Sequence, residues 1–195
     1  MTSKDVILGR IRAARATFDG TIPRDYRRSF PAADLDLLVD RLVDYKAVVH
    51  RTGDIPGTIR TIVGTGVVII PPGLPRDWIS GMSVLPDEGL PADRLAAADG
   101  VVTAAAVAIA ETGTIVLDAS PDQGRRIISL LPDLHICVLR ADQVVASVPE
   151  AVARLDPRRP LTWISGPSAT SDIELNRVEG VHGPRNLHVI LLEAA

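Results

Sequence analysis

A glutamate between two apolar runs is the first residue of this chain that could do chemistry. Glu111 lies in the sequence Ala-Glu-Thr-Gly-Thr, after an alanine-rich stretch and before the apolar run 115–117. A carboxylate at the edge of an apolar region has a raised pKa because burial disfavours its charged form, and such a group can act as a nucleophile, an acid or a base. Alternatively, Glu111 ends a helix and Gly113 supplies a left-handed turn. Glu111 is therefore a candidate catalytic residue with a structural alternative.

A run rich in hydroxyl groups follows an apolar strand-like stretch at residues 161–165. It reads Gly-Pro-Ser-Ala-Thr-Ser-Asp-Ile-Glu over residues 166–174. Ser171 and Glu174 have the spacing of a capping box, which predicts that a short helix begins here. The free amides of its first turn and the hydroxyl groups of the run could hold a carboxylate or a phosphate, although a well-capped helix alone would explain the pattern. The candidate ligand-binding residues of this run are Ser168, Thr170, Ser171 and Asp172.

A histidine flanked by glycines comes just before the last apolar run. The sequence Gly-Val-His-Gly-Pro-Arg spans residues 180–185. Little side-chain bulk surrounds His182, so a ligand or backbone could approach it closely. Arg185 could pair with an anion through its planar guanidinium, while His182 donates or accepts a proton. A lone histidine in a tight turn can also satisfy nearby backbone groups. We predict His182 as a second catalytic candidate and Arg185 as an anion-binding residue.

Other reactive side chains give weaker signals. Arg125 and Arg126 follow a predicted strand and could reach into the same site, although arginines that open a helix are usually solvated. Cys137 is the single cysteine, and its apolar surroundings indicate an inert core thiol. One thiol cannot form a disulfide within the chain or ligate an iron-sulfur cluster. The histidines show no metal-ligand spacing. We expect no metal and no cofactor in this chain.

The elements that must position these residues alternate between strands and helices. Short apolar runs rich in β-branched residues are typical of a buried, mainly parallel sheet. The predicted strands are residues 67–70, 84–85, 100–103, 114–117, 136–139, 161–165 and 188–192. The predicted helices between them are residues 57–62, 92–97, 104–110, 124–130 and 149–155. The alternation predicts an α/β fold with helices flanking the sheet. Ligands of such sheets collect at the carboxyl ends of the strands, where we expect the three candidate segments to share one pocket.

Two amphipathic helices are predicted at the start of the chain. Thr2 or Ser3 can cap the first, and the second is predicted from apolar positions between Leu35 and Lys46. Residues 1–56 are thus predicted as an N-terminal helical extension and residues 57–195 as an α/β domain, both within one structural unit.

Composition excludes some classes of function. The 195 residues include 21 Lys and Arg against 24 Asp and Glu, a net charge of -3, and 3% aromatic residues. Neither a positive field nor stacking platforms are available, so nucleic acid is not an expected partner. The longest apolar stretch, residues 101–110, is about half of the ~20 residues that a membrane helix needs. The start of the chain lacks the apolar region of a secretory signal. We expect a cytoplasmic protein without a membrane span.

Three segments resemble a known family. Residues 108–118 (AIAETGTIVLD), 124–145 (GRRIISLLPDLHICVLRADQVV) and 164–193 (ISGPSATSDIELNRVEGVHGPRNLHVILLE) are similar to signature segments of LUD-domain proteins, in particular the lactate-utilisation C type. The resemblance implies a fold of the NagB/RpiA/CoA-transferase-like type. It also implies a place in the oxidation of L-lactate to pyruvate, beside partner subunits that hold iron-sulfur clusters. The residues that match the family's motifs are Glu111, Ser168, Thr170, Asp172, His182 and Arg185.

Three hypotheses of function follow. The first is an accessory component of lactate oxidation that binds a small carboxylate or another anion and works beside iron-sulfur partner subunits. The second is an autonomous CoA-transferase-like or sugar-phosphate-type enzyme that uses Glu111, by analogy between folds. The third is a non-catalytic interaction module whose basic N-terminal helices recruit a partner or form a homo-oligomer. The sequence leaves open whether the chain is itself an enzyme.

Overall fold

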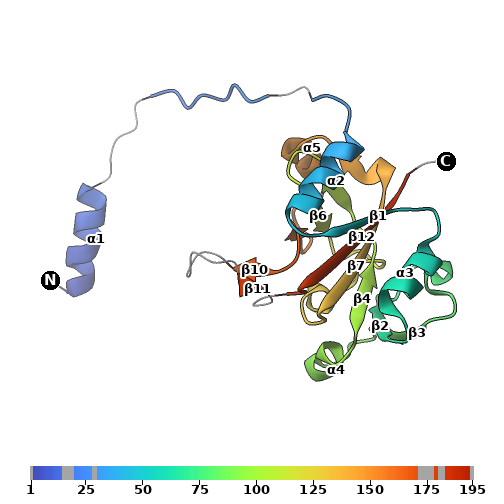
Figure 1. The fold of residues 1–195 in the computed structure, drawn as a ribbon. Helices are drawn as coiled ribbons and strands as arrows, with labels where there is room; N and C mark the ends of the chain where they lie inside the picture. The colour runs from blue at the N-terminus through green and yellow to red at the C-terminus, as the bar shows by residue number, and fades with distance from the viewer. Residues whose placement is uncertain (1, 15–19, 28–29, 171–177, 180–182, 194–195) are drawn as a thin grey trace.

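A parallel sheet of six strands forms the centre of the molecule. The computed structural model describes residues 2–14, 20–27, 30–170, 178–179 and 183–193 (Figure 1). The strand order is β1-β12-β7-β4-β2-β3, and every neighbouring pair is parallel. The strands are β1 (Val48–Arg51), β2 (Val67–Ile70), β3 (Ser83–Pro86), β4 (Gly100–Thr103), β7 (Leu134–Arg140) and β12 (Asn186–Leu192). The predicted α/β fold with a mainly parallel sheet is confirmed.

Two of the predicted strands, residues 114–117 and 161–165, belong to a second, smaller sheet that the sequence did not predict. Its order is β8-β5-β6-β9, and a separate antiparallel pair joins β10 to β11. These strands are β5 (Val107–Ile109), β6 (Thr114–Leu117), β8 (Val144–Val145), β9 (Thr162–Ile164), β10 (Ala169–Thr170) and β11 (Val178–Glu179). The prediction of a helix over residues 104–110 is therefore wrong. Alanine favours helices, but β5 is buried throughout and pairs with β6 on one side and β8 on the other, so tertiary pairing overrides local preference.

Five α-helices and three short 3₁₀ helices complete the described fold. They are α1 (Ser3–Ala13), α2 (Leu35–Asp44), α3 (Ile55–Val63), α4 (Ala92–Ala96), α5 (Val148–Arg154), η1 (Arg76–Ile79), η2 (Arg126–Ser129) and η3 (Ala141–Gln143). The carboxylates of Asp34 and Asp54 accept hydrogen bonds from backbone amides at the starts of α2 and α3. The helix predicted over residues 124–130 is reduced to η2. The left-handed φ of Gly124 and the proline at 132 leave room for one short turn.

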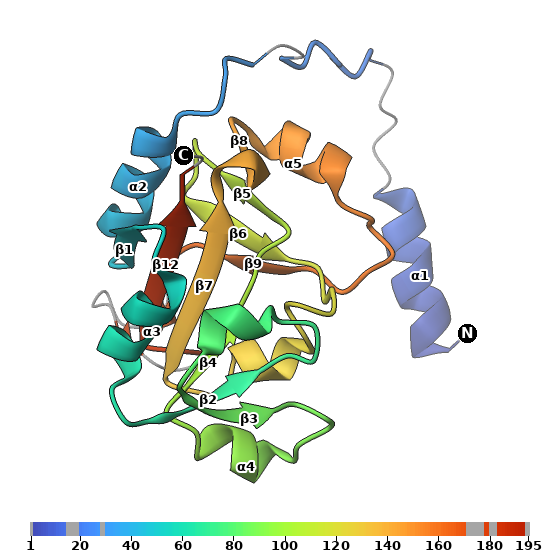
Figure 2. The same ribbon diagram turned by 90° about the vertical axis from the view of Figure 1, so that its right-hand side faces the viewer.

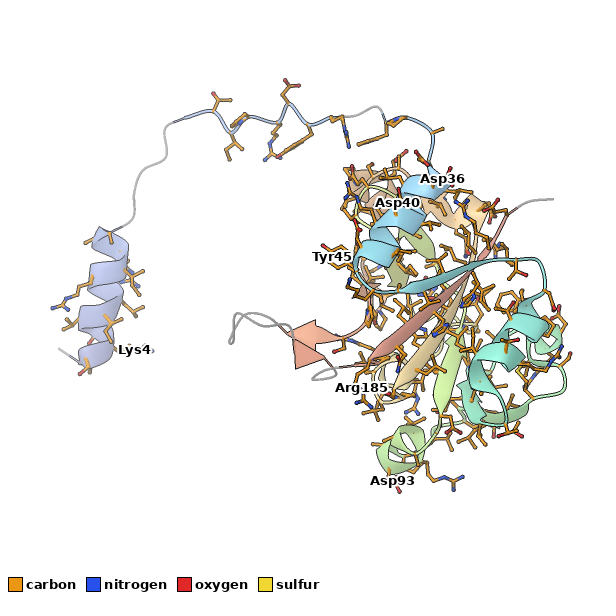
Figure 3. All side chains as sticks on the ribbon, viewed as in Figure 1. Lys4, Asp36, Asp40, Tyr45, Asp93 and Arg185 are labelled. Carbon is orange, nitrogen blue, oxygen red and sulfur yellow. The ribbon has the colours of Figure 1, made fainter. Side chains whose placement is uncertain are left out.

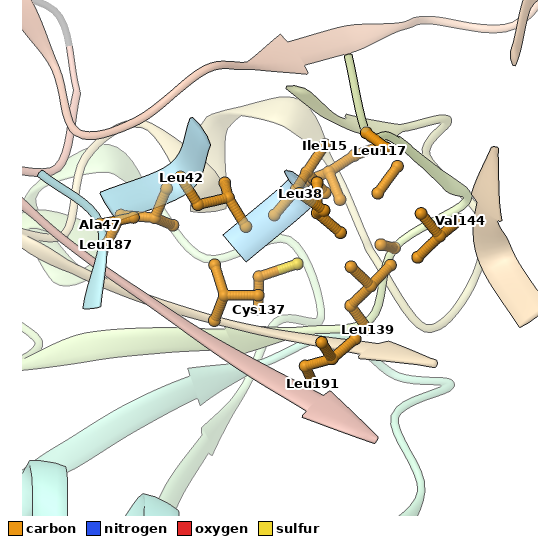
Figure 4. Packing of buried hydrophobic residues seen from close by; sticks show 14 residues of the cluster. Leu38, Leu42, Ala47, Ile115, Leu117, Cys137, Leu139, Val144, Leu187 and Leu191 are labelled. Carbon is orange, nitrogen blue, oxygen red and sulfur yellow. The ribbon is translucent and has the colours of Figure 1, made fainter. Parts of the chain in front are cut away.

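The two faces of the central sheet are covered by different elements. On one face, Cys137 and Leu139 of β7 pack with Leu38 and Leu42 of α2 and with Ile115 of the smaller sheet (Figure 4). On the other face, Ile136 and Val138 of β7 pack with Ile55 and Ile59 of α3, and Figure 2 shows α3 beside β7. This alternation follows from the two-residue period of a strand. It also fixes the direction of His135, which points to the face that the smaller sheet covers.

The first part of the chain divides into two unlike pieces. Helix α1 has no buried residue and stands apart from both sheets in two views (Figures 1 and 2). Leu38 and Leu42 of α2, in contrast, are fully buried in the core, and β1 pairs with β12 along its whole length. The predicted extension of residues 1–56 thus includes an unpredicted strand of the central sheet. Among the helices that the structure describes, none is long and apolar enough to cross a membrane.

Candidate functional site

A cleft of about 190 Å³ lies where the smaller sheet meets the amino ends of β7 and β12. Its polar lining consists of Arg126, Ser129, His135, Thr162, Ser165 and Ser168. Trp163, Ile164 and Leu187 are among its apolar residues. The cleft is at the opposite end of the parallel strands from where we expect a ligand site on sequence grounds. This difference arises because β9 belongs to the other sheet, and its carboxyl end lies against the amino ends of β7 and β12.

Two of the three predicted segments meet at this cleft. The amide of Ser168 donates a hydrogen bond to the carbonyl oxygen of Pro184, at 2.8 Å. A Cβ atom on Gly183 would lie 3.4 Å from the Cβ of Ser168, an ordinary van der Waals contact, so the two residues lie side by side. The segments that follow and precede these residues pair as β10 and β11. The hydroxyl-rich run and the Gly-Pro-Arg segment therefore share one site despite their separation in sequence.

Several predicted residues of these segments cannot be described. Ser171, Asp172 and His182 lie outside the described residues. The backbone of Thr170 lies in β10, in register with Val178. Ser168 is the predicted ligand-binding residue that the structure places in the cleft.

Arg185 is held by a carboxylate of the protein itself. Its Nε and Nη2 atoms donate to the two carboxylate oxygens of Asp133, at 2.6 and 3.0 Å. This hydrogen-bonded pair lowers the pKa of Asp133 below its ordinary value. Arg185 lies beside the amino end of β12 (Figure 3) and does not line the cleft. The guanidinium of Arg185 thus binds a carboxylate of the chain itself, and its role in binding a ligand anion stays a prediction.

Glu111 lies in the hairpin loop between β5 and β6. Its carboxylate accepts one hydrogen bond from Arg27 Nη2 at 2.9 Å and another from the amide of Val148, the first residue of α5, at 3.1 Å. Gly113 has a φ of 61°, so it supplies the left-handed turn residue, in a hairpin instead of at a helix end. Glu111 and Ser168 line two different cavities. The structure thus places Glu111 and the described part of the hydroxyl-rich run in separate cavities.

His135 is the cleft residue that sequence reasoning missed. Its side chain is 1% exposed, and its Nε2 atom lies 2.8 Å from Oγ1 of Thr103. Burial lowers the pKa of His135 to about 4, so the ring is neutral at pH 7. A histidine at the start of an apolar strand was the available signal. The neighbouring β9 and the segment before β12, which make a cleft of this position, are remote in sequence.

The two arginines that follow β6 have different roles. Arg125 donates to both carboxylate oxygens of the buried Asp87, at 2.8 and 2.5 Å, and this pair lowers the pKa of Asp87. Arg126 lines the cleft. One of the pair therefore fixes the loop, while the other places a positive charge at the site.

Comparison with known proteins identifies relatives of this chain. Residues 91–192 match the model of the LUD domain. A lactate utilization protein C from Deinococcus radiodurans is 53% identical over 162 residues, which cover 78% of this chain and 76% of that protein. The chain belongs to the LUD domain family. The match to the LUD domain includes every residue that lines the cleft.

A more distant relative and a solved structure are also similar to this LUD protein. A lactate utilization protein C from Bacillus licheniformis is 34% identical over 100 residues, which cover 47% of this chain and 41% of that protein. The alignment thus spans less than half of the Bacillus protein. A crystal structure of a DUF162 family protein from Deinococcus radiodurans is 46% identical, with a TM-score of 0.70, and the match covers 81% of this chain and 95% of that one.

Proposed function

We propose that this chain acts in the utilisation of L-lactate, as an accessory component of its oxidation to pyruvate in the cytoplasm. The observation that supports this role most strongly is the 53% identity to a protein named lactate utilization protein C, over 78% of this chain. The match to the LUD domain model, over residues 91–192, includes the region that forms the cleft. Shared ancestry of the whole domain makes a shared pathway the simplest interpretation.

The distribution of redox ligands favours an accessory role. Oxidation of lactate removes two electrons, which must pass to an acceptor. The chain has a single cysteine, and Cys137 is fully buried with a pKa raised to about 12 by burial. An iron-sulfur cluster needs several thiolates, so the residues present do not fit one. We therefore assign the iron-sulfur clusters of the reaction to partner subunits and the handling of a small organic acid to this chain.

The chemistry of the cleft suits a small carboxylate. Its described lining includes Arg126 and Ser168 of the hydroxyl-rich run but no aspartate or glutamate. A guanidinium near hydroxyl groups, without a competing carboxylate, is a common arrangement for binding a carboxylate. The accessory component would thus hold the substrate or the product of the oxidation.

Genetic complementation tests the proposed function. In Deinococcus radiodurans, deletion of the gene of the relative should abolish growth on L-lactate. This chain is then expressed in the deletion strain. We expect growth on L-lactate to return, with growth on pyruvate as the control. Absence of growth at a protein level equal to that of the relative would contradict the proposal.

The accessory character has its own test. The purified chain alone should not oxidise L-lactate with an artificial electron acceptor, because it has no redox ligand set. Turnover of L-lactate by the isolated chain would show an autonomous enzyme instead.

A further inference from the structure

Among the described lining residues, one side chain gives the cleft its charge. Arg126 is exposed, and within the described part of the chain its guanidinium forms no ion pair or hydrogen bond. None of the lining residues that the structure describes is an aspartate or a glutamate. By contrast, two other arginines already form ion pairs within the chain. Arg125 pairs with Asp87, and Arg185 pairs with Asp133. The described lining therefore offers one positive charge, which matches a ligand with one negative charge.

The floor of the cleft offers one neutral polar atom. His135 uses Nε2 in its contact with Thr103, and this is its one side-chain hydrogen bond among the described residues. No buried side-chain nitrogen or oxygen of the described residues lacks a partner. The other ring nitrogen, Nδ1, is therefore not fully enclosed, and the space that His135 lines is the cleft. Nδ1 can thus form one hydrogen bond with a bound molecule.

The state of this histidine limits what it can recognise. Burial keeps the ring uncharged at neutral pH, so it adds no second positive charge to the site. A neutral imidazole donates through one nitrogen and accepts through the other. A hydroxyl group can complement either tautomer, because it both donates and accepts. A carbonyl oxygen complements the tautomer in which Nδ1 bears the proton.

The remaining lining favours a short ligand. The hydroxyl groups of Ser129 and Ser165 already have protein partners, at 2.9 Å to the carbonyl oxygen of Arg126 and 2.8 Å to Thr114. Leu130, Ile164 and Leu187 line the apolar part. The volume of about 190 Å³ is below the range of roughly 300–1,000 Å³ typical of pockets for larger ligands. An acid of a few carbon atoms fits these limits.

We propose that the cleft binds a short 2-hydroxy or 2-oxo monocarboxylate, with Arg126 at the carboxylate and His135 at the oxygen of the adjacent carbon. The choice of this class over other hydroxylated monoanions rests on the proposed function. The pairing of one cation with one neutral polar atom comes from the lining itself.

A tryptophan in the cleft provides the test. Trp163 lines it and is 43% exposed, whereas the other tryptophan, Trp78, packs against the cluster at α3. In a Trp78→Phe protein, fluorescence of Trp163 is titrated with L-lactate, pyruvate and propionate, and calorimetry checks each dissociation constant. We expect L-lactate and pyruvate to bind about tenfold more tightly than propionate, because propionate leaves Nδ1 of His135 without a partner.

Variants separate the two contacts. Arg126→Ala should weaken binding of all three acids by a similar factor, whereas Arg94→Ala, at an exposed arginine of α4, should not. His135→Leu should bind all three acids with similar affinity, because leucine has no polar atom at the position of Nδ1. Since that variant changes a buried residue, the comparison of ligands on the Trp78→Phe protein decides the matter if the variant does not fold. Equal affinity for propionate and L-lactate, or no binding of any of the three, would overturn the proposal.

The outcome is distinguishable from failure of the proposed function. Complementation on L-lactate without any acid binding would remove the ligand site and leave the role in lactate utilisation. Selective binding of L-lactate and pyruvate without complementation would do the reverse.

Discussion

The carboxylate of Glu111 joins three segments that are distant in sequence. It accepts from Arg27 and from the amide at the start of α5, while the backbone amide of Glu111 donates to the carbonyl oxygen of Ala146. Sequence spacing alone could not reveal these partners, because two of them follow Glu111 by more than thirty residues and one precedes it by more than eighty. A residue chosen for its chemistry thus has a structural role in the described fold.

Replacing Glu111 by Gln tests that role. Glu111→Gln keeps an oxygen acceptor for the amide of Val148 and loses the ion pair with Arg27, whose side chain is 61% exposed. We expect the free energy of unfolding to fall by less than about 1 kcal/mol in urea denaturation, since exposed ion pairs contribute little. Growth of the complemented strain on L-lactate should persist. Loss of growth by a folded Glu111→Gln protein would restore the catalytic hypothesis.

Of two residues that line the cleft, Ser168 could be predicted from the sequence and His135 could not. Ser168 is predictable because its motif is local, and the structure places it in the cleft. In the sequence, His135 does not stand out, because the histidines show no metal-ligand spacing and nothing near His135 indicates a site. Its polar character becomes useful only when β9 and the segment before β12 close the cleft around it.

Strands that consist of one continuous apolar stretch can be predicted from the sequence. The strands β2, β4 and β7 are continuous apolar runs, and their pairing in a parallel sheet follows from the alternation with helices. In contrast, β1 escapes prediction because Val48–Arg51 is short and half polar, and it becomes a strand by pairing with β12. For β5, alanine-rich composition suggests a helix that pairing overrides.

The hairpin between β5 and β6 gives a prediction at this scale. Gly113 has a φ of 61°, and an added Cβ would lie 2.6 Å from the Cβ of Arg41 and 3.0 Å from its backbone carbon. Gly81 has a φ of 75° with nothing within 4 Å. Gly81→Ala should therefore reduce the free energy of unfolding by about 1 kcal/mol from backbone strain alone. Gly113→Ala should reduce it by roughly 3 kcal/mol, since strain and overlap add. Equal midpoints of urea unfolding for the two variants would contradict the close packing of α2 on the hairpin.

Truncation tests how much of the N-terminal region the whole molecule needs. Removing residues 1–20 takes away α1, which has no buried residue, so the melting temperature should stay within a few degrees of that of the full chain. Removing residues 1–51 also deletes α2 and β1 and exposes the core around Cys137, and this protein should not fold cooperatively. Thermal unfolding followed by circular dichroism checks both outcomes. A cooperative transition in the shorter protein would show that β1 and α2 are dispensable.

The stability of the whole molecule should depend on pH through its buried histidine. The pKa of His135 is about 4 in the fold against 6.5 in the unfolded chain, so between these values the unfolded state binds the additional proton. The free energy of unfolding therefore keeps the full contribution of the neutral His135 above pH 6.5. It decreases as the pH falls to about 4, by up to about 1.4 kcal/mol per pH unit. Burial and the neighbouring His50 also lower the pKa of His188, in the same direction. Urea unfolding between pH 7 and 4.5 measures the slope, which His135→Asn should reduce. A flat profile in the natural protein would contradict the burial of His135.

The cleft joins these scales, because a charge on η2, a histidine of the central sheet and a strand of the smaller sheet meet there. The most direct measurement is the growth rate on L-lactate of the complemented strain with Arg126→Ala in place of the natural chain. We predict that growth on L-lactate is lost or strongly slowed while the protein level and growth on pyruvate remain unchanged, and that Arg94→Ala grows like the natural chain. Growth of Arg126→Ala at the natural rate would contradict the assignment of this cleft to lactate utilisation.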